Sequence, residues 1–388
     1  MTKADSRSMQ FTHLGLENWR NFVRVEADLH SRVIIVGPNA AGKSNLLDAF
    51  RFLRDLVADG GGFRESVMKP QRGGVSKLRA LAARRNPDIA IDASFVDRNG
   101  TLWDYELRFN QDARKQPVIR KERVKRQGEI LLGRPDAADL DDRARLSQTY
   151  LEQVNVNKAF RPIAEFFQSI QYLHIVPQLV REPDRSVGRL NDPFGGDFLE
   201  QIARTPKRVL DARLGRIRDA LKIAVPQLQD LELWRDERGT PHLRGKYEHW
   251  RPNGAWQNEE QFSDGTLRLL GLLWTVLDGG GPLLLEEPEL SLHPAVVRHL
   301  PQMFARIQRQ TGRQILISTH STDLLQDSGI GADEVLLLQP DAEGTRVRLA
   351  GDIPEIVTLL NEGVSMGDAA MPHVQPPSVE QLSLFGER

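Results

Sequence analysis

Residues 37–44, Gly-Pro-Asn-Ala-Ala-Gly-Lys-Ser, constrain the fold of this chain more than any other segment. The apolar run 33–36 precedes them, and residues 45–53 follow with leucine and phenylalanine at helical spacing. A G-x-x-x-x-G-K-S loop requires this order of strand, glycine-rich turn and helix. Glycines let backbone N–H groups surround phosphate oxygens, and the helix N-terminus adds favourable donors. The sequence therefore predicts a nucleotide phosphate site between a strand and a helix.

Two side chains of this loop have specific expected roles. Lys43 is expected to reach the β- and γ-phosphates, and the Ser44 hydroxyl to bind Mg²⁺. The residues expected to contact the nucleotide are Gly37, Pro38, Asn39, Ala40, Ala41, Gly42, Lys43, Ser44 and Asn45.

A second segment, 281–294, carries two adjacent carboxylates at the end of an apolar run. Residues 283–285 predict a short buried strand that leads into Glu286 and Glu287. Because side chains alternate along a strand, we expect the two carboxylates to point in different directions. Glu286 would then hold Mg²⁺ or one of its waters, and Glu287 would polarise an attacking water. The alternative is a solvated acidic turn. A helix is predicted next, over about 294–310.

Two more segments present polar groups at the ends of predicted elements. Ser263 and Gly265 precede an apolar helix predicted over 267–277, where a hydroxyl and a bare N–H would form an anion site. An ordinary N-cap is the alternative for Ser263. Residues 314–318 predict a strand that ends just before His320, which we interpret as a γ-phosphate sensor.

The order of these segments resembles the ABC-type ATPases of the RecF, SMC and OLD group. The similarity is to compact prokaryotic members without a long coiled coil, and it is strong over about residues 10–60 and 255–340. Residues 16–22 also resemble that group's N-F-R-x-F strand. Glu286 stands where many relatives have Asp, although Glu-Glu is common in this subgroup. The signature Ser-Asp-Gly-Thr differs from the Ser-Gly-Gly-Gln of transporters, which argues against a transporter subunit.

The resemblance implies an α/β fold: an ABC-type P-loop ATPase head with a mixed sheet, an antiparallel β-lobe and a helical insert. It also implies ATP and Mg²⁺ as cofactors and a head-to-tail homodimer. Ser263 and Gly265 of one protomer would close on the ATP held by Lys43 and Ser44 of the other, while Glu287 orients the water. Such phosphoryl transfer depends on positioning and electrostatics, so no nucleophilic Ser or Cys is expected.

Relatives place a glutamine near Mg²⁺, between the two nucleotide-binding halves. Gln178 follows an apolar strand-like run and is the candidate here. Gln168, Gln171 and Gln71 remain alternatives.

Composition agrees with a multi-domain protein of the cytoplasm. The chain has 388 residues, no cysteine and a net charge of −1. The absence of cysteine excludes a disulfide scaffold, a cysteine zinc site and a thiol nucleophile. We see no secretory signal and no apolar stretch long enough to span a bilayer, so a nucleoid-associated cytoplasmic location without membrane contact is expected.

With so small a net charge, nucleic-acid affinity must come from local basic patches. One patch lies on a predicted strand and comprises Arg120, Lys121, Arg123, Lys125 and Arg126. The other, with Arg213 and Arg216, lies on a predicted helix over 204–218, whose expected buried stripe is Val209, Leu210, Leu214 and Ile217. We interpret both as contacts to the phosphates of double-stranded DNA. The alternative is a solvated face, which charge runs usually are.

Breaks in composition divide the chain into five expected parts. These are an N-terminal ATPase half with P-loop and β-lobe (1–135), a helical insert (136–227), a C-terminal ATPase half with signature, acidic segment and His switch (228–350), a C-terminal segment (351–370) and a flexible tail (371–388). Within them, strands are predicted near 88–96, 101–110 and 228–250.

The tail ends in a peptide similar to the one by which bacterial polymerases and mismatch-repair proteins bind the sliding clamp. Its residues are Gln381, Leu382, Ser383, Leu384 and Phe385, and a proline-rich stretch precedes them. A chance match, or packing onto the protein's own domain, is the alternative.

Three classes of function follow from these features. The first is a DNA-linked ATPase of replication-associated repair or anti-phage genome defence, acting with a separate effector protein. The second is an ATP-driven switch that binds a protein partner and no DNA. The third is a nuclease, and it lacks support because no second carboxylate cluster or Toprim-like domain is recognisable after residue 350.

Overall fold

The computed structural model describes residues 9–83, 86–182, 192, 194–249, 255–376, 381 and 383. The chain divides into two units, the first with residues 1–171, 280–284 and 301–388, and the second with residues 172–279 and 285–300. Residues 136–171 of the expected helical insert therefore cluster with the first unit, and residues 172–227 with the second.

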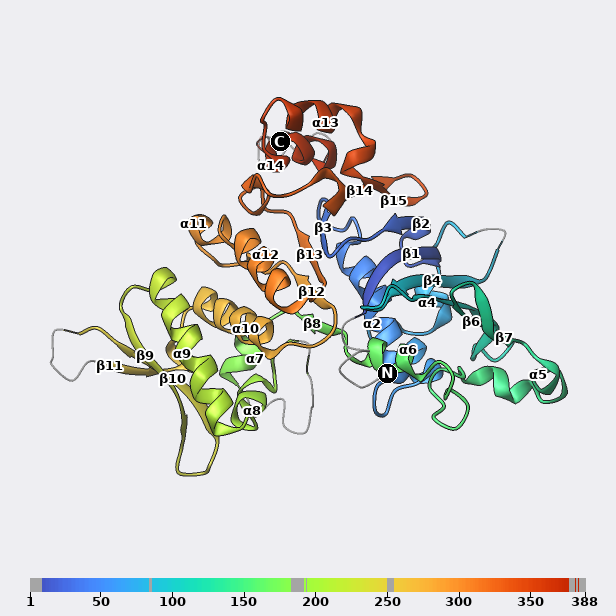
Figure 1. Cartoon of the computed structure of the whole chain (residues 1–388), viewed down its shortest axis with the longest axis horizontal. Helices are drawn as coiled ribbons and strands as arrows, with labels where there is room; N and C mark the ends of the chain where they lie inside the picture. The colour runs from blue at the N-terminus through green and yellow to red at the C-terminus, as the bar shows by residue number, and fades with distance from the viewer. Residues whose placement is uncertain are drawn as a thin grey trace. The chain divides into compact units, whose positions relative to one another are not determined.

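An antiparallel sheet forms one layer of the first unit, with strand order β2-β1-β4-β5-β6-β7 (Figure 1). Its strands are β1 (Gln10–Trp19), β2 (Phe22–Asp28), β4 (Ile89–Val96), β5 (Leu102–Gln111), β6 (Pro117–Arg126) and β7 (Glu129–Arg134). β4 and β5 match the strands predicted near 88–96 and 101–110. Along β4, buried residues alternate with partly exposed ones, so one face of this sheet is covered and the other is polar.

A second, mixed sheet has the order β15-β14-β3-β13-β12-β8. Its strands are β3 (Arg32–Val36), β8 (Gln171–Leu173), β12 (Leu283–Glu286), β13 (Ile315–Thr319), β14 (Val335–Asp341) and β15 (Gly344–Leu349). β3 runs parallel to β13 and β14, whereas β14 and β15 are antiparallel. β8 and β12 continue from the first unit into the second. The expected α/β head with a mixed sheet and an antiparallel β-lobe is confirmed.

Aromatic packing joins helix α2 (Lys43–Val57) to the antiparallel sheet. The ring of Phe11 in β1 lies 5.0 Å from that of Phe50 in α2 and 4.8 Å from that of Phe166. The other helices mainly of this unit are α3 (Phe63–Met68), α4 (Val75–Leu78), α5 (Ala137–Asp141), α6 (Arg161–Gln168), α12 (Leu300–Thr311), α13 (Pro354–Asn361) and α14 (Met366–Ala370). Buried aromatic clusters contribute much of the stability of a core, so these ring contacts stabilise the packing of α2 against the antiparallel sheet.

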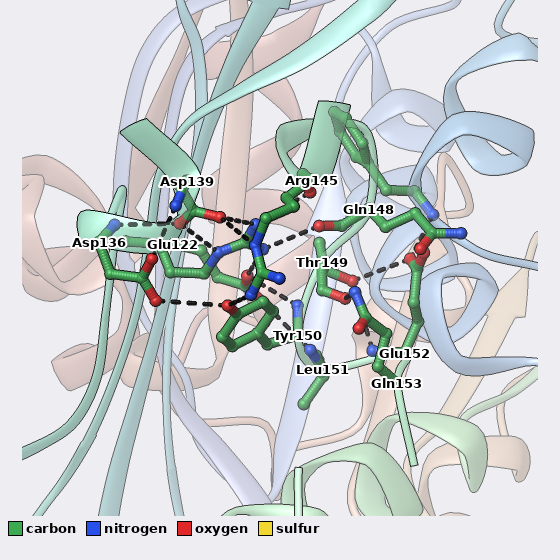
Figure 2. Close-up of polar contacts among 12 residues, drawn as sticks. Glu122, Asp136, Asp139, Arg145, Gln148, Thr149, Tyr150, Leu151, Glu152 and Gln153 are labelled. Atoms are coloured by element: carbon green, nitrogen blue, oxygen red, sulfur yellow. Dashed lines mark hydrogen bonds and ion pairs between the residues drawn. The ribbon is translucent and has the colours of Figure 1, made fainter. Parts of the chain in front are cut away.

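A buried ion-pair cluster fixes the chain after β7 (Figure 2). The Arg134 guanidinium lies 3.0 Å from the carboxylate of Glu122 and 2.8 Å from that of Asp139, and all three side chains are inaccessible to solvent. The backbone N–H of Tyr150 also donates to Glu122, at 2.8 Å, and Arg134 stacks on the Tyr150 ring. Because buried charges must be paired, this cluster anchors the stretch around 136–150 to the β6–β7 hairpin.

The second unit packs helices around a three-stranded antiparallel sheet of order β11-β10-β9. Its elements are α7 (Pro177–Arg181), α8 (Phe198–Ala203), α9 (Lys207–Ala224), β9 (Leu228–Arg235), β10 (Pro241–Tyr247), β11 (Ala255–Asn258), α10 (Asp264–Asp278) and α11 (Pro294–Val297). Helix α9 packs on β9 and α10 (Figure 1).

Two sequence predictions about helices were wrong in detail. Val209 was expected in the buried stripe of the basic helix but is 41% exposed, because Leu210, Leu214, Ile217 and Leu221 form the buried face. The single helix predicted over about 294–310 is two helices, α11 and α12. Pro301 has no N–H for a helical bond to residue 297, so the run of helical hydrogen bonds is interrupted here, and α12 begins at Leu300 with the proline in its first turn.

Candidate nucleotide site

The phosphate-binding loop lies between β3 and α2, as the sequence predicts. Its backbone is left-handed at Ala40 (φ 63°) and at Gly42 (φ 100°). Lys43 is buried, and its Nζ donates to the carbonyl oxygen of Gly37 at 3.0 Å. The ammonium group is therefore held across the opening of the loop, where phosphate oxygens would bind. Ser44 is exposed at the first turn of α2.

The turn between β1 and β2 supports the loop from one side. The side-chain amide of Asn21 donates to the carbonyl of Ala41 at 2.8 Å and accepts from Asn45 at 2.7 Å. A Cβ on Gly42 would lie 2.3 Å from the Asn21 amide, so this glycine is required by contact as well as by its φ. Sequence reasoning quoted residues 16–22 as a family motif but assigned no role to Asn21. The sequence signal that could have identified Asn21 is its position as a polar residue at the turn within this motif.

His320 follows β13 and is exposed. It lines a cavity of about 470 Å³ together with Gly37, Pro38 and Asn39 of the phosphate-binding loop. The end of the C-terminal segment and the start of the tail also line this cavity, which the sequence did not predict; these lining residues are Gly367, Asp368, Met371, Pro372, Val374, Gln375 and Pro376. The structure thus brings two predicted parts of the nucleotide site, the loop and the histidine, to one cavity.

The signature segment of the second unit caps helix α10. The Ser263 hydroxyl accepts a hydrogen bond from the Thr266 N–H at 3.1 Å, which is the N-cap arrangement. Arg181 of α7 donates to the carbonyl of Phe262 at 2.7 Å and to the carboxylate of Asp264 at 2.6 Å. The N-cap alternative is therefore observed, and a phosphate contact by Ser263 and Gly265 stays a proposal. Arg181 was missed by sequence reasoning.

The acidic segment of the second unit has one carboxylate on a strand and one beyond it. β12 ends at Glu286, whose Oε2 accepts a hydrogen bond from the hydroxyl of Tyr172. Glu287 follows with left-handed backbone, at φ 44°. The direction of its side chain is therefore set by a turn, and the strand alternation we expected does not extend to it. Left-handed backbone at a residue other than glycine is uncommon and marks a constrained position.

Arg268 of α10 lies beside these carboxylates. With Glu286 and Glu287 it lines a cavity of about 10 Å³, roughly the volume that one water molecule needs. Its Nε is buried without a hydrogen-bond partner. Burial lowers the pKa of Arg268, and the charges of Asp264 and Glu287 offset this only in part. Sequence reasoning missed this cation, since one arginine in an apolar helix carries no motif.

The candidate glutamines have different surroundings. Gln178 is exposed on the short helix α7, and Gln168 and Gln71 are exposed as well. The side-chain carbonyl of Gln171 accepts from Arg313 at 2.5 Å. Gln178 stays a proposal as the Mg²⁺-reaching residue.

The donors expected for a metal fit magnesium by their chemistry. The Ser44 hydroxyl and the Glu286 carboxylate are hard oxygen ligands, which Mg²⁺ prefers. Among the described residues, no group of three or more His, Cys, Asp or Glu side chains could hold a metal ion. Mg²⁺ is commonly bound through one or two protein oxygens, substrate phosphates and water.

Most of the chain, including the phosphate-binding loop and His320, matches a known protein family. Residues 32–326 match the family described as "AAA domain, putative AbiEii toxin, Type IV TA system". The chain belongs to this AAA-domain family.

The curated relatives of this AAA-family protein are similar over short regions. It is 40% identical to "Endonuclease GajA" of Bacillus cereus over 58 residues, which are 15% of this chain and 10% of the relative. It is 30% identical to "DNA replication and repair protein RecF" of Acaryochloris marina over 124 residues, which are 32% of this chain and 29% of the relative. The chain thus aligns with less than a third of the length of either relative.

Solved structures extend the likeness to the whole fold. A crystal structure of "the SmcHead bound to the C-winged helix domain of ScpA" has a TM-score of 0.54 at 13% identity, and the match covers 87% of this chain and 96% of that one. An Smc head with an extended coiled coil, in a complex derived from Pyrococcus furiosus, has a TM-score of 0.53 at 11% identity, with 91% and 99% covered. The AAA-family protein therefore has the fold of an SMC head domain.

Several basic residues of the AAA-family protein form ion pairs within it. Glu106 lies 2.8 Å from Lys121 and 2.5 Å from Arg123, and these cations outweigh burial so that its pKa is lowered. In the second unit, Arg213 pairs with Asp278 at 2.6 Å, whereas Arg216 is exposed. Of the other basic residues, Arg120 and Arg126 are exposed and Lys125 is half-buried.

Most of the tail peptide lies outside the described residues. Leu382, Leu384 and Phe385 are among those not described, while Gln381 and Ser383 are described and exposed. In the part of the chain that the structure describes, no helix is long and apolar enough to cross a membrane.

Proposed function

We propose that this protein is a DNA-associated ATPase that dimerises on binding ATP and acts in replication-linked DNA repair or anti-phage genome defence. Its tail, residues 381–385, recruits it to the bacterial sliding clamp, and a separately encoded effector works with it. The observation that carries the ATPase proposal is the geometry of the loop between β3 and α2. Its backbone is left-handed at Gly42, and the Nζ of Lys43 donates a hydrogen bond to the carbonyl oxygen of Gly37. The similarity to a DNA replication and repair protein, RecF, and to the endonuclease GajA supports the link to DNA.

In the proposed mechanism, each described side chain has one task. Lys43 and the loop N–H groups bind the phosphates, Glu287 orients the attacking water, and His320 contacts the γ-phosphate. Mg²⁺ supplies charge neutralisation between the phosphates, and Ser44 and Glu286 are the residues that would hold it. Ser263 and Gly265 of a second protomer complete the site, with their helix N-terminus directed at the nucleotide.

A second function has one observation in its favour. Lys121 and Arg123 are ion-paired with Glu106, and Arg213 with Asp278, so part of the positive charge of both basic patches is offset within the protein. An ATP-driven switch that controls an effector protein without binding DNA is therefore the alternative. DNA-stimulated ATP hydrolysis separates the two functions, since only the first predicts it.

The ATPase proposal is tested by turnover and by mass in solution. Glu287→Gln should retain ATP, lose hydrolysis and accumulate as a dimer in multi-angle light scattering, whereas Lys43→Ala should lose nucleotide binding. Glu260→Gln, at an exposed glutamate, is the matched control and should behave as wild type. Undiminished hydrolysis by Glu287→Gln would refute its role. A Ser263→Arg protein that still dimerised with ATP would contradict the composite site.

A further inference from the structure

The hydroxyl of Tyr172 donates a hydrogen bond to Oε2 of Glu286. Tyr172 belongs to β8, and its side chain is buried; Glu286 ends β12 and is half-buried. His174 directly follows β8, and its ring nitrogen Nδ1 lies 3.3 Å from the backbone carbonyl oxygen of Glu286. A buried tyrosine hydroxyl requires a polar partner, and here that partner is the carboxylate expected to face the metal.

A hydrogen bond from a neutral donor to an ionised carboxylate is stronger than one between neutral groups. It also engages only one of the two carboxylate oxygens. A glutamate side chain has one more rotatable bond than aspartate, so its carboxylate loses more conformational freedom when it is held in one position. The hydroxyl of Tyr172, whose side chain is buried on β8, is a donor in a fixed position that restricts the Glu286 carboxylate.

We propose that Tyr172 is a positioning residue that holds the Glu286 carboxylate in the orientation required for Mg²⁺–nucleotide. The tyrosine compensates for the extra methylene by which Glu286 exceeds an aspartate at this position. This inference rests on the proposed function, since it assumes that Glu286 faces the metal. Removing a residue that orients a metal ligand in this way typically lowers the metal affinity by about 10–100-fold.

The test measures binding instead of turnover. A fluorescent ATP analogue is titrated onto the full-length protein at fixed nucleotide and varied Mg²⁺, and anisotropy gives the Mg²⁺ midpoint. Tyr172→Phe removes one oxygen and keeps the ring, so it should raise the midpoint roughly tenfold or more. Binding at saturating Mg²⁺ and the unfolding temperature should stay near wild type. Tyr247→Phe is the matched control, because Tyr247 is a half-buried tyrosine of the same unit whose ring lies beside that of Phe262.

A double-mutant cycle with Glu286→Asp decides whether the two residues act together. The shorter aspartate side chain of that variant cannot occupy the place of the Glu286 carboxylate against Tyr172. Tyr172→Phe should therefore shift the midpoint of the Glu286→Asp protein by less than about twofold, which makes the two changes non-additive. An equal shift in both backgrounds, or no shift in the Glu286 background, would overturn the inference. Wild-type protein that binds no nucleotide at any Mg²⁺ concentration would overturn the proposed function as well.

Discussion

A Cβ built on Gly265 would lie 2.4 Å from the carbonyl oxygen of Ser291. Ser291 itself has left-handed backbone, at φ 62°. The start of α10 and the loop after the acidic segment therefore meet backbone to backbone, at a distance that only glycine permits. Within the second unit, this contact ties the signature segment to the loop that follows Glu287.

Gly265→Ala should accordingly destabilise the protein by about 1–3 kcal/mol, the usual cost of overpacking. Ser263→Ala, which removes only the N-cap of the same helix, should cost about 1 kcal/mol. Urea denaturation followed by circular dichroism measures both. A Gly265→Ala protein as stable as wild type would show that the Ser291 loop can move aside freely.

Arg72 should be among the most costly residues to replace in the first unit. It is fully buried and pairs with Asp48 at 2.8 Å and with Asp55 at 2.9 Å, both on α2. Arg72→Leu leaves two buried carboxylates without this partner, so a loss of about 3–5 kcal/mol is expected. Arg24→Leu removes an exposed pair with Glu26 and should cost under about 1 kcal/mol.

The same cluster predicts acid sensitivity. Burial raises the pKa of Asp48 and of Asp55, but the charge of Arg72 outweighs it, so both pKa values are lowered in the folded state. Lowered pKa values stabilise the fold above the ordinary value of 3.8, and this contribution is lost as the pH falls below it. Arg72→Leu should therefore flatten the loss of stability below about pH 4. Parallel acid-unfolding curves for wild type and variant would contradict this account.

The pKa of Asp92 is shifted in the opposite direction from those of Asp48 and Asp55. Asp92 lies opposite Glu106 in the antiparallel sheet, and burial together with the charge of Glu106 raises its pKa to about 6. Folding then favours the protonated acid, so its contribution is present below the ordinary value of 3.8 and is lost as the pH rises through about 6. Asp92→Asn should be more stable than wild type by roughly 1–2 kcal/mol at pH 8 and closer to wild type at pH 5. Glu129→Gln, at an exposed strand end, is the control for the loss of one carboxylate from the same sheet.

The basic patches predict binding that is indifferent to DNA sequence and weakened steeply by salt, since cations on phosphate release condensed counterions. Replacing Arg120, Lys125 and Arg126 by Glu should weaken affinity and reduce the salt slope more than replacing Lys121 and Arg123, which are already paired with Glu106. Arg216→Glu should likewise weaken DNA affinity more than Arg213→Glu does, because Arg213 is already paired with Asp278. Filter binding at several salt concentrations gives both quantities. Wild-type binding in all these variants would remove both basic patches from the DNA-binding proposal.

The tail predicts an interaction with the sliding clamp that is separate from ATP turnover. A peptide of residues 372–388 should bind purified clamp in calorimetry and compete with clamp-bound polymerase. Losing both Leu384 and Phe385 should weaken this at least about a hundredfold, since each buried apolar side chain contributes roughly 1.5–3 kcal/mol. The same double change in the full-length protein should leave ATP hydrolysis unaltered. No heat and no competition at high micromolar peptide would show that the tail docks on the protein's own domain or on another partner.

Local patterns in the sequence determined the elements of this protein and their chemistry. The leucine and phenylalanine spacing of residues 45–53 placed α2, the glycines placed the loop before it, and the apolar run 283–285 placed β12, because each depends on neighbours in the chain. The predicted His320 likewise follows directly from the end of β13. Such signals arise from hydrogen bonding and side-chain spacing within one element.

Only the tertiary structure decided which residues support those side chains. Asn21 against Gly42, Tyr172 against Glu286 and Gly265 against Ser291 are contacts between segments far apart in the chain. The ion pairs of Lys121 and Arg123 with Glu106 depend on strand pairing between β5 and β6, so a basic run could not show which of its charges have a partner. No local pattern encodes these partners, because a hydrogen bond or an ion pair between distant segments exists only once the chain has folded.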